Sequence, residues 1–237
     1  MPNIKEYNYS STKFGNIKIL SWTEIYEQLQ NHLVLPKTIE LHLIRHAETE
    51  TNADKLITGS QDVKLNSKGK EQAIYLGRKL DKHYNIAFSS AMERSQKTLE
   101  IALKEGGVDL DNLFVDKRLN ERSLGILEGQ RSRWIPEYEA GDLNYAPQEG
   151  ETYLEVAQRT LSFLLDLADF CSNKDINKVL ICGHMGPLRI MVGIIEEQEN
   201  PVTVLGLSFR NAEVYKLTWN RLTIPKFLQG VDERRSS

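Results

Sequence analysis

From residue 38 onward, apolar segments of strand length alternate with amphipathic segments of helix length. In the clearest helical segment, residues 152–171, apolar residues recur every three or four positions. Strands that alternate with helices in this way predict a mostly parallel sheet whose two faces are covered by helices. The predicted fold class is therefore α/β, a three-layer αβα sandwich. The predicted strands are 38–45, 86–90, 113–115 and 178–182, and the predicted helices are 67–83, 91–104, 152–171 and 187–195.

The residues outside this regular region have weaker patterns. Residues 17–20 predict a short strand and residues 22–33 a short helix, and the alternating residues 213–219 predict an edge strand. The chain is long enough for one large domain. The expected parts are an N-terminal extension at 1–37, one domain at 38–225 that includes an insertion at 130–150, and a frayed tail at 226–237.

The charge balance argues against several kinds of partner. A formal net charge of -3 and an isoelectric point near 6.0 provide no overall attraction to nucleic acid or to an anionic membrane surface. The apolar runs are too short to span a bilayer, and the polar start Met1–Glu6 is not typical of a signal peptide. Two cysteines are too few for a disulfide scaffold and fit a reducing compartment. We therefore expect a cytoplasmic protein in which local cations hold any bound anion.

Basic residues follow three of the predicted strands. Arg45 and His46 end the first, Arg94 follows the second, and His184 follows the last. Because parallel strands end at the same edge of a sheet, these four side chains are expected to meet there. Such a cluster is unfavourable without an anion, and a phosphate suits the guanidinium fork. A carboxylate, Glu121, follows the remaining strand and is a candidate proton donor.

Each of these residues taken alone has an ordinary structural explanation. A histidine after a strand is commonly a structural residue that forms hydrogen bonds. Arg94 could pair with Glu93 or Glu100 on a helix surface. Glu121 could be a surface carboxylate or pair with Arg118 or Arg122. The joint occurrence of these residues, in this order and at these strand ends, favours a functional interpretation of His184, Arg94 and Glu121. Cys182, which lies inside an apolar strand, is interpreted as a core residue.

The same residues resemble the motifs of the histidine phosphatase superfamily, which has the phosphoglycerate-mutase-like fold. That family has an Arg-His-Gly or Arg-His-Ala motif, here Arg45-His46-Ala47, and a second-arginine motif that resembles residues 89–98. Its acid motif resembles residues 119–125, and its second histidine resembles Gly183-His184. The further matching positions are Glu48, Asn52, Thr58, Gly59, Asp62, Leu65, Ser67, Gly69, Gln72, Ala73, Leu127, Glu128, Gly129, Pro147, Gly150, Glu151 and Arg159. The resemblance covers residues 38–220.

The resemblance implies a catalytic role for five of these residues. His46, as a neutral imidazole, would attack the phosphorus atom and become a phosphohistidine. Arg45, Arg94 and His184 would hold the phosphoryl oxygens and offset their charge, which is the main catalytic need in phosphoryl transfer. Glu121 would protonate the leaving oxygen and then help water to attack the phosphoenzyme.

Other matching positions concern the ligand. Asn52 resembles a further phosphate-pocket residue, and Thr58 and Gly59 resemble a turn that contacts the substrate. The resemblance implies neither a metal nor another cofactor, and the sequence has no metal motif such as His-Glu-x-x-His. The expected partner is a phosphorylated small molecule.

Two departures separate this chain from the cofactor-dependent mutases of the family. Those enzymes have a longer, proline-rich segment between the acid and the second histidine, whereas Glu121 and His184 are 63 positions apart (184 minus 121). They also usually have a tryptophan after the threonine-glycine turn, where this chain has Ser60. A mutase must exclude water to retain its phosphoenzyme. We therefore expect phosphomonoester hydrolysis, with phosphoglycerate mutase as the alternative.

Two other functions are weaker hypotheses. A cysteine phosphatase needs five residues between its cysteine and its arginine, but six lie between Cys182 and Arg189. A family member that only binds a phosphorylated ligand is the other hypothesis, although every matching catalytic position is occupied. The sequence has no Walker-type loop, which argues against an ATPase or a kinase.

The family layout implies that residues 130–150 form a lid-like insertion and that substrate choice depends on it and on the extension at 1–37. Trp134, Tyr138 and Tyr145 either line an apolar wall of the pocket or pack the lid onto the body. The extension either caps the pocket or contributes to a homodimer. No residue pattern selects between a sugar bisphosphate, a nucleotide and a phosphoprotein.

Overall fold

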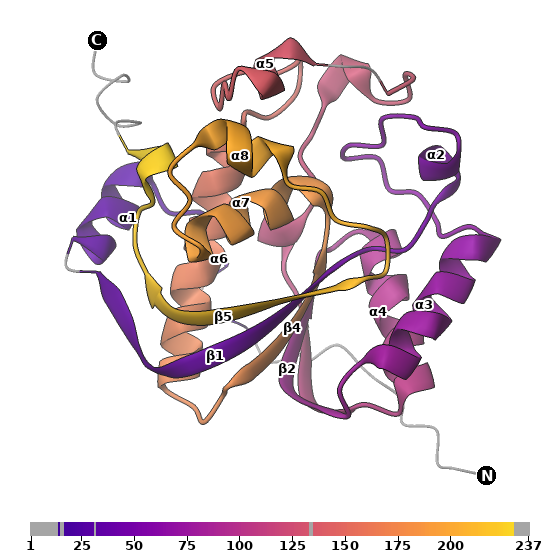
Figure 1. Cartoon of the computed structure of the whole chain (residues 1–237), viewed down its shortest axis with the longest axis horizontal. Helices are drawn as coiled ribbons and strands as arrows, with labels where there is room; N and C mark the ends of the chain where they lie inside the picture. Colours follow the sequence, from indigo (N-terminus) through magenta and orange to yellow (C-terminus); the bar gives the residue numbers. More distant parts are fainter. Residues whose placement is uncertain (1–13, 15–16, 31, 133–134, 230–237) are drawn as a thin grey trace.

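The computed structural model describes residues 14, 17–30, 32–132 and 135–229 of the chain. Within these residues the centre is a five-stranded sheet with the strand order β3-β2-β4-β1-β5 (Figure 1). The strands are β1 (Leu33–Arg45), β2 (His83–Ser89), β3 (Asp109–Val115), β4 (Lys178–Gly183) and β5 (Val214–Leu222). The α-helices are α1 (Trp22–Leu29), α2 (Glu50–Ala53), α3 (Ser67–Lys79), α4 (Glu93–Gly106), α5 (Pro136–Glu139), α6 (Tyr153–Ser172), α7 (Met185–Ile195) and α8 (Pro201–Gly206), and short 3-10 turns cover Lys117–Leu119, Gly125–Leu127 and Lys226–Leu228.

The sheet is parallel except at one edge. β3, β2, β4 and β1 run parallel to their neighbours, and β5 is antiparallel to β1. Successive side chains of a strand point to opposite faces, so Leu41 and Leu43 enter one core while Ile44 enters the other. The mostly parallel sheet and the antiparallel edge strand predicted from the sequence are both confirmed.

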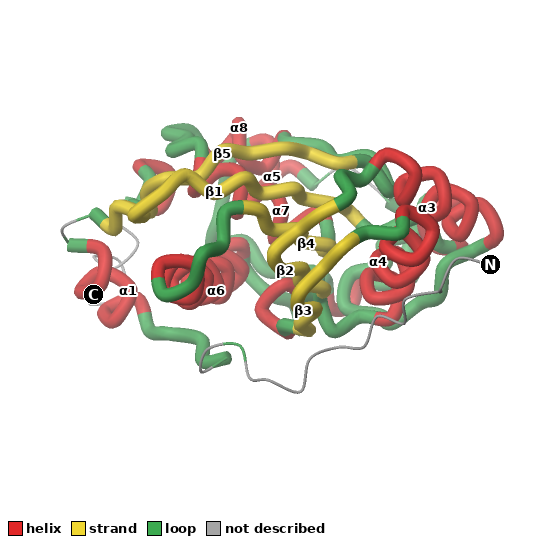
Figure 2. Tube along the Cα trace, turned by 90° about the horizontal axis from the view of Figure 1, so that it is seen from below, coloured by secondary structure: helices red, strands yellow, loops and turns green. Residues whose placement is uncertain are grey.

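Helices cover both faces of the sheet. α3 and α4 lie on one face, and α1 and α6 lie on the other (Figure 2). The buried apolar side chains form two clusters, one shared with α3 and α4 and one shared with α1, α6 and α7. The predicted three-layer αβα fold is therefore confirmed.

The parallel strands end at a common edge. Arg45, the last residue of β1, pairs with Gly183 at the end of β4. Ser89, at the end of β2, pairs with Cys182, also in β4. The segments that leave these strands therefore start side by side, and Figure 1 shows α2, which follows β1, in the upper part of the molecule.

β1 begins five residues before the predicted start at residue 38. Its first part pairs with β5 alone, from Leu33 opposite Leu222, and the register shifts between Val34 and Ile39. Pro36 lies within this irregular stretch and has no N–H to donate to a ladder. Such a residue is tolerated at a bulge or along a single-sided pairing, which explains why a proline did not end the strand.

Residues 17–20 form no strand, so that prediction is wrong. The N–H of Leu20 donates to Oγ of Ser162 at 2.9 Å, and its carbonyl accepts from Nε2 of Gln158 at 2.7 Å. Side chains of α6 therefore satisfy this backbone in place of a partner strand. The polar start Met1–Glu6 lies outside the described residues.

The helix predicted at 22–33 is shorter than expected. α1 starts at a capping box formed by Ser21 and Glu24 and ends at Leu29. His32 has a φ of 52°, a conformation that a helix cannot contain, and Leu33 already belongs to β1.

The chain does not fray at Lys226, so that expectation is also wrong. Residues 226–228 form a 3-10 turn, and Phe227 and Leu228 are buried. Phe227 lies against Gly193 of α7, where a Cβ would approach its ring to 3.2 Å. Apolar burial therefore holds this segment, and residues 230–237 lie outside the described part.

Other boundaries differ by a few residues. β3 begins at Asp109 rather than at residue 113, because even its polar first half pairs with β2. α3 ends at Lys79 rather than at residue 83, since His83 already pairs within the sheet.

No helix in the described part is both long enough and apolar enough to cross a membrane.

Candidate active site

The structure brings the predicted basic residues together. Arg45 ends β1 and His46 follows it, Arg94 lies in the first turn of α4 after β2, and His184 is the N-cap of α7 after β4. The ring centroids of His46 and His184 are 5.0 Å apart. Both arginines lie close enough to disfavour a positive charge on either ring. Segments up to 139 positions apart (184 minus 45) thus meet at one edge of the sheet.

The His46 ring has a defined tautomer. Its Nδ1 lies 2.7 Å from the carbonyl oxygen of Ala47, and a carbonyl can only accept, so Nδ1 carries the proton. In the neutral ring Nε2 is then bare, and no hydrogen bond among the described residues occupies it. Burial, together with Arg94 and Arg45, holds the pKa of His46 well below 6.5. The ring is therefore a neutral base whose free nitrogen can act as a nucleophile.

The His184 ring is also neutral. Burial lowers its pKa well below 6.5, and His46 and the nearby arginines act in the same direction. Nε2 of His184 lies 2.7 Å from Oγ of Ser90, while Nδ1 is buried without a partner in the described part. Buried polar atoms are normally paired, so an unpaired ring nitrogen beside two guanidinium groups suits an incoming anion.

The two arginines are fixed by backbone carbonyls. Nη1 of Arg45 donates to Phe209 at 3.0 Å, and Arg94 donates to Gly59 at 2.9 Å and to Gln61 at 2.5 Å. Nε of each arginine is buried and has no partner among the described residues. Burial lowers the pKa of both guanidinium groups, and Glu121 counteracts this shift. Two buried cations with unused donors are chemically suited to hold an anion.

The predicted substrate turn lies against Arg94. Gly59 has a φ of 50° and presents its carbonyl to that arginine. A Cβ at this position would lie 2.2 Å from the Glu128 carboxylate, which itself accepts from the N–H and the hydroxyl of Ser60. Thr58 is nearly buried and bonds through Oγ1 to the hydroxyl of Thr51 at 2.6 Å. The turn therefore requires glycine and holds one of the two arginines.

Glu121 lies at the start of α7. Its Oε1 accepts from the N–H of Arg122 and of Gly186, each at 2.9 Å, and its Oε2 accepts from the N–H of Met185 at 3.1 Å. A helix N-terminus favours a carboxylate. This carboxylate interacts electrostatically with Arg45 and Arg94, so it belongs to the same cluster.

The side chain of Asn52 takes part in a helix cap. It is the third residue of α2, and its Oδ1 accepts from the N–H of Thr49 in a capping box. The side-chain oxygen is thus used to start a short helix, and its contact with a phosphate remains a prediction.

Several contributors to the cluster were not singled out from the sequence. Ser90 holds His184, and Nδ2 of Asn211 donates to the carbonyl of His46 at 2.7 Å. Phe209 supplies the carbonyl that holds Arg45. Ser90 follows a strand end and could have been found by that signal, whereas residues 207–212 have no periodicity or motif that would mark them.

Cys182 is a core residue, as interpreted. Its side chain is buried in the cluster between the sheet and the α3–α4 layer. Burial raises the pKa of this thiol to about 12, so the thiolate that a cysteine phosphatase needs is strongly disfavoured.

The aromatic residues of the 130–150 segment contact the body of the protein. Tyr138 and Tyr145 pack edge to face with centroids 6.5 Å apart, and the Tyr138 hydroxyl accepts from Nη1 of Arg122. Tyr138 and Tyr145 therefore attach this segment to Arg122, the residue after Glu121. Trp134 lies outside the described residues.

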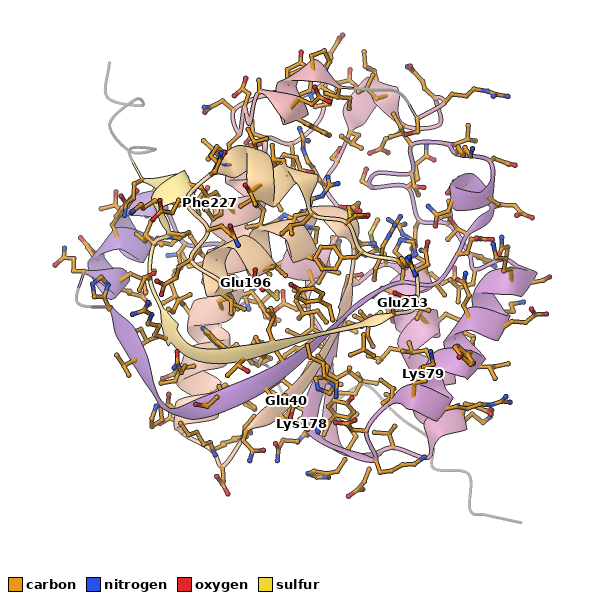
Figure 3. The ribbon with its side chains drawn as sticks, in the orientation of Figure 1. Glu40, Lys79, Lys178, Glu196, Glu213 and Phe227 are labelled. Atoms are coloured by element: carbon orange, nitrogen blue, oxygen red, sulfur yellow. The ribbon has the colours of Figure 1, made fainter. Side chains whose placement is uncertain are left out.

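A second polar cluster lies where β1 begins to pair with the start of β4. Ligand atoms of Glu40, His42 and Asp81 lie within 4.8 Å of one another. Lys178 pairs with both carboxylates, and Figure 3 shows it beside Glu40. The ammonium group of Lys216 lies 3.9 Å from Glu40 and 3.7 Å from Asp81. Two lysines already balance the carboxylate charges, so we assign no metal to this cluster.

Comparison with known proteins gives matches along most of the chain. The family described as the histidine phosphatase superfamily (branch 1) matches residues 41–224. A 2,3-bisphosphoglycerate-dependent phosphoglycerate mutase from Neisseria gonorrhoeae is 31% identical over 233 residues, covering 80% of this chain and 99% of that protein. The protein of the same name from Neisseria meningitidis is 37% identical over 148 residues. That match covers 58% of this chain and only 59% of the length of the relative.

Solved structures with the same fold include a phosphatase. The alpha-ribazole phosphatase from Shigella flexneri superposes with a TM-score of 0.63 at 22% sequence identity, covering 79% of this chain and 97% of that one. At this identity the similarity concerns the fold.

Proposed function

Because the chain belongs to the histidine phosphatase superfamily, we propose that it is a metal-independent phosphomonoester hydrolase that acts through a phosphohistidine at His46. The observation that carries this proposal is the state of the His46 ring, which is buried and neutral, with Nδ1 committed to Ala47 and Nε2 left to react. The adjacent guanidinium groups of Arg45 and Arg94 have unused donors for a phosphate. The substrate is a small phosphorylated metabolite.

In the first half of the reaction, the Nε2 lone pair of His46 forms a bond to phosphorus while the ester oxygen leaves. Arg45, Arg94 and His184 donate to the three equatorial oxygens, whose charge must be offset in the transition state. The protonated carboxyl group of Glu121 gives its proton to the leaving oxygen, so that an alcohol departs. His46 is then a phosphohistidine.

In the second half, water replaces the alcohol. Glu121, now a carboxylate, accepts a proton from the water as its oxygen attacks phosphorus, and the bond to Nε2 of His46 breaks. Inorganic phosphate leaves, and both residues return to their starting states. Asn52, Thr58 and Gly59 are proposed to contact the substrate at the edge of this site.

Phosphoglycerate mutase is the second candidate, because the relatives at 31% and 37% identity are named as such mutases. Two features favour hydrolysis. The segment from Glu121 to His184 is short, and Ser60 stands where the mutases have a tryptophan. Ser60 is exposed, and its hydroxyl donates a hydrogen bond to the carboxylate of Glu128. This position therefore adds no apolar side chain that would exclude water from the site.

The first test measures phosphate release from p-nitrophenyl phosphate. We expect steady turnover by the unmodified protein and its loss in His46→Ala. A protein that binds phosphate but releases none from any ester would instead be a binding protein without catalytic activity.

The second test supplies 3-phosphoglycerate together with 2,3-bisphosphoglycerate. A hydrolase releases inorganic phosphate, whereas fast conversion to 2-phosphoglycerate without phosphate release would identify a mutase and overturn the proposal. A panel of phosphorylated metabolites then identifies the preferred substrate.

A further inference from the structure

Arg122, which follows Glu121 in the chain, is a buried cation with neutral partners. Only 2% of its surface is exposed, and no carboxylate in the described part of the chain forms an ion pair with it. A buried charge is costly unless its hydrogen-bonding groups are satisfied. All three of its nitrogen atoms therefore need partners from the surrounding segments.

Those partners come from a single stretch of chain. Nε donates to the carbonyl of Glu151 at 2.7 Å, Nη2 donates to the carbonyl of Tyr145 at 2.8 Å, and Nη1 donates to the hydroxyl of Tyr138. The guanidinium group also lies over two rings, 4.3 Å from the centroid of Tyr153 and 5.3 Å from that of Tyr138. The side chain of Arg122 thus binds α5, the loop after it and the start of α6.

The backbone beside Arg122 is fixed by the same stretch. Ser123 and Glu151 form two hydrogen bonds. The Ser123 carbonyl accepts from the Glu151 N–H at 3.0 Å, and the Ser123 N–H donates to the Glu151 carboxylate at 3.0 Å. Glu151 is in turn paired with Arg159 of α6 at 3.1 Å. The residues after Glu121 are therefore held from the side of α6.

The other side of the Glu121-Arg122 dipeptide faces α7. The Glu121 carboxylate accepts from Met185 and Gly186, and from the N–H of Arg122 itself. Gly186 permits this approach, since a Cβ there would lie 2.7 Å from Oε1 of Glu121 and 3.2 Å from Cβ of Arg122. The dipeptide is thus clamped between α7, which holds the acid, and the 138–153 segment, which holds the arginine.

Building on the proposed phosphatase activity, we propose that Arg122 is a positioning residue that couples the docking of the 138–153 segment to the placement of the Glu121 carboxylate beside Arg45 and Arg94. Its loss leaves phosphate binding in place and weakens proton donation to the leaving oxygen. The defect should therefore grow as the leaving group becomes a poorer one.

The experiment compares Arg122→Lys with the unmodified protein on two esters. p-Nitrophenyl phosphate has a leaving group that departs with little help from an acid, whereas glycerol 2-phosphate leaves as an alkoxide that needs a proton. We expect kcat for glycerol 2-phosphate to fall about 30-fold and kcat for p-nitrophenyl phosphate to fall about threefold, with KM unchanged, because general acid catalysis is worth roughly 100-fold or more. Arg78→Lys, at an exposed arginine paired with Glu105, is the matched control and should change neither rate.

A double-mutant cycle with Glu121→Gln separates positioning from general damage. If Arg122 acts through Glu121, adding Arg122→Lys to Glu121→Gln lowers kcat no further, within about twofold. Equal losses in both backgrounds, equal losses on both esters, or a rise in KM alone would each overturn the proposal. Tyr138→Phe removes one acceptor of Arg122 and keeps the ring. Its kcat should fall by smaller factors than that of Arg122→Lys, again more for glycerol 2-phosphate than for p-nitrophenyl phosphate. This variant replaces Arg122→Lys if the latter does not fold.

Failure of the proposed function gives a different result. An unmodified protein that hydrolyses neither ester contradicts the phosphatase activity and with it this role. A protein that hydrolyses both esters but gives an additive cycle contradicts the role of Arg122 alone.

Discussion

Burial and the neighbouring guanidinium groups hold the pKa of His46 well below its usual value, and burial together with His46 lowers the pKa of His184. Below about pH 6.5 the unfolded chain binds protons at these positions while the folded chain does not. The folded state therefore loses stability as the pH falls through the ordinary histidine range. The same neutral state keeps His46 available as a nucleophile in mildly acidic solution.

This linkage gives a measurable slope. Each histidine that the folded state keeps neutral lowers the free energy of unfolding by up to about 1.4 kcal/mol for each pH unit below about pH 6.5. We expect urea unfolding of His46→Asn, compared between about pH 7 and about pH 5.5, to show a smaller loss of stability than the unmodified protein. Ile19→Asn, at an exposed position that carries no ionisable group, is the control that should retain the full slope. An unchanged slope in His46→Asn would show that this ring titrates normally.

Cys182 offers a second prediction for a single residue. Cys182→Ser places a hydroxyl in an apolar core, so the free energy of unfolding should fall by about 1–2 kcal/mol while kcat stays within about twofold of the original. Phosphate release and urea unfolding measured on one preparation give both values. Loss of activity in a folded Cys182→Ser protein would revive a thiolate mechanism.

Among the elements, α7 connects the second histidine to the acid. His184 caps this helix, and the first two N–H groups of the helix donate to Glu121. The position of the carboxylate therefore depends on how closely its backbone approaches the helix start. Gly186 is the residue that permits this approach.

Gly186→Ala tests that dependence. The added Cβ would lie 2.7 Å from Oε1 of Glu121, so the carboxylate must move. We expect kcat for an alkyl phosphate to fall at least about tenfold, in line with the loss of a positioned acid. Gly206→Ala is the matched control because nothing lies within 4 Å of the added Cβ, and its rate should not change. A fully active Gly186→Ala protein would mean that Glu121 is not held by the start of this helix.

The sequence predicts elements well where a pattern has a single physical cause. The strand ends at Arg45 and at Gly183 could be placed because apolar runs stop there, and parallel pairing then brings His46 near His184. The start of β1 could not, because Pro36 signals a break that the pairing with β5 overrides. Arg45 and Arg94 are held by backbone carbonyl groups of loops. These contacts could not be predicted from the sequence, because every residue type has a backbone carbonyl.

At the scale of the whole molecule, the two faces of the sheet have separate cores, and Phe14 and the buried side of α1 belong to one of them. Phe14 is 2% exposed and its ring contacts those of Phe88, Phe114, Phe163 and Phe170. α1 packs on α6, and Figure 1 shows it on the opposite side of the molecule from α2. Capping of the pocket by this helix is therefore not supported, and a part in a homodimer stays a prediction.

Phe14→Ala should accordingly affect stability and leave the chemistry alone. Removing a buried phenylalanine costs about 3–5 kcal/mol of unfolding free energy. We expect a large loss in urea unfolding and a kcat within about twofold of the original for the folded fraction. Ile19→Ala, at an exposed position on the same segment, is the control with little change in stability. A drop in kcat without a drop in stability would place this segment at the pocket instead.

The global arrangement was predictable because alternating strands and helices admit few topologies, whereas the insertion of Phe14 between sheet and helix was not. A lone aromatic in a polar segment has no periodic partner, so only the three-dimensional packing shows which core it enters.

The central claim is that the bare Nε2 of His46 takes up the phosphoryl group. The most direct measurement is to mix the protein with a 32P-labelled phosphomonoester, stop the reaction within one turnover, and map the label by peptide mass spectrometry. The account predicts acid-labile, base-stable label on His46, approaching one phosphoryl group per chain, and none in His46→Ala. Label on another residue, or steady phosphate release from His46→Ala, would contradict it.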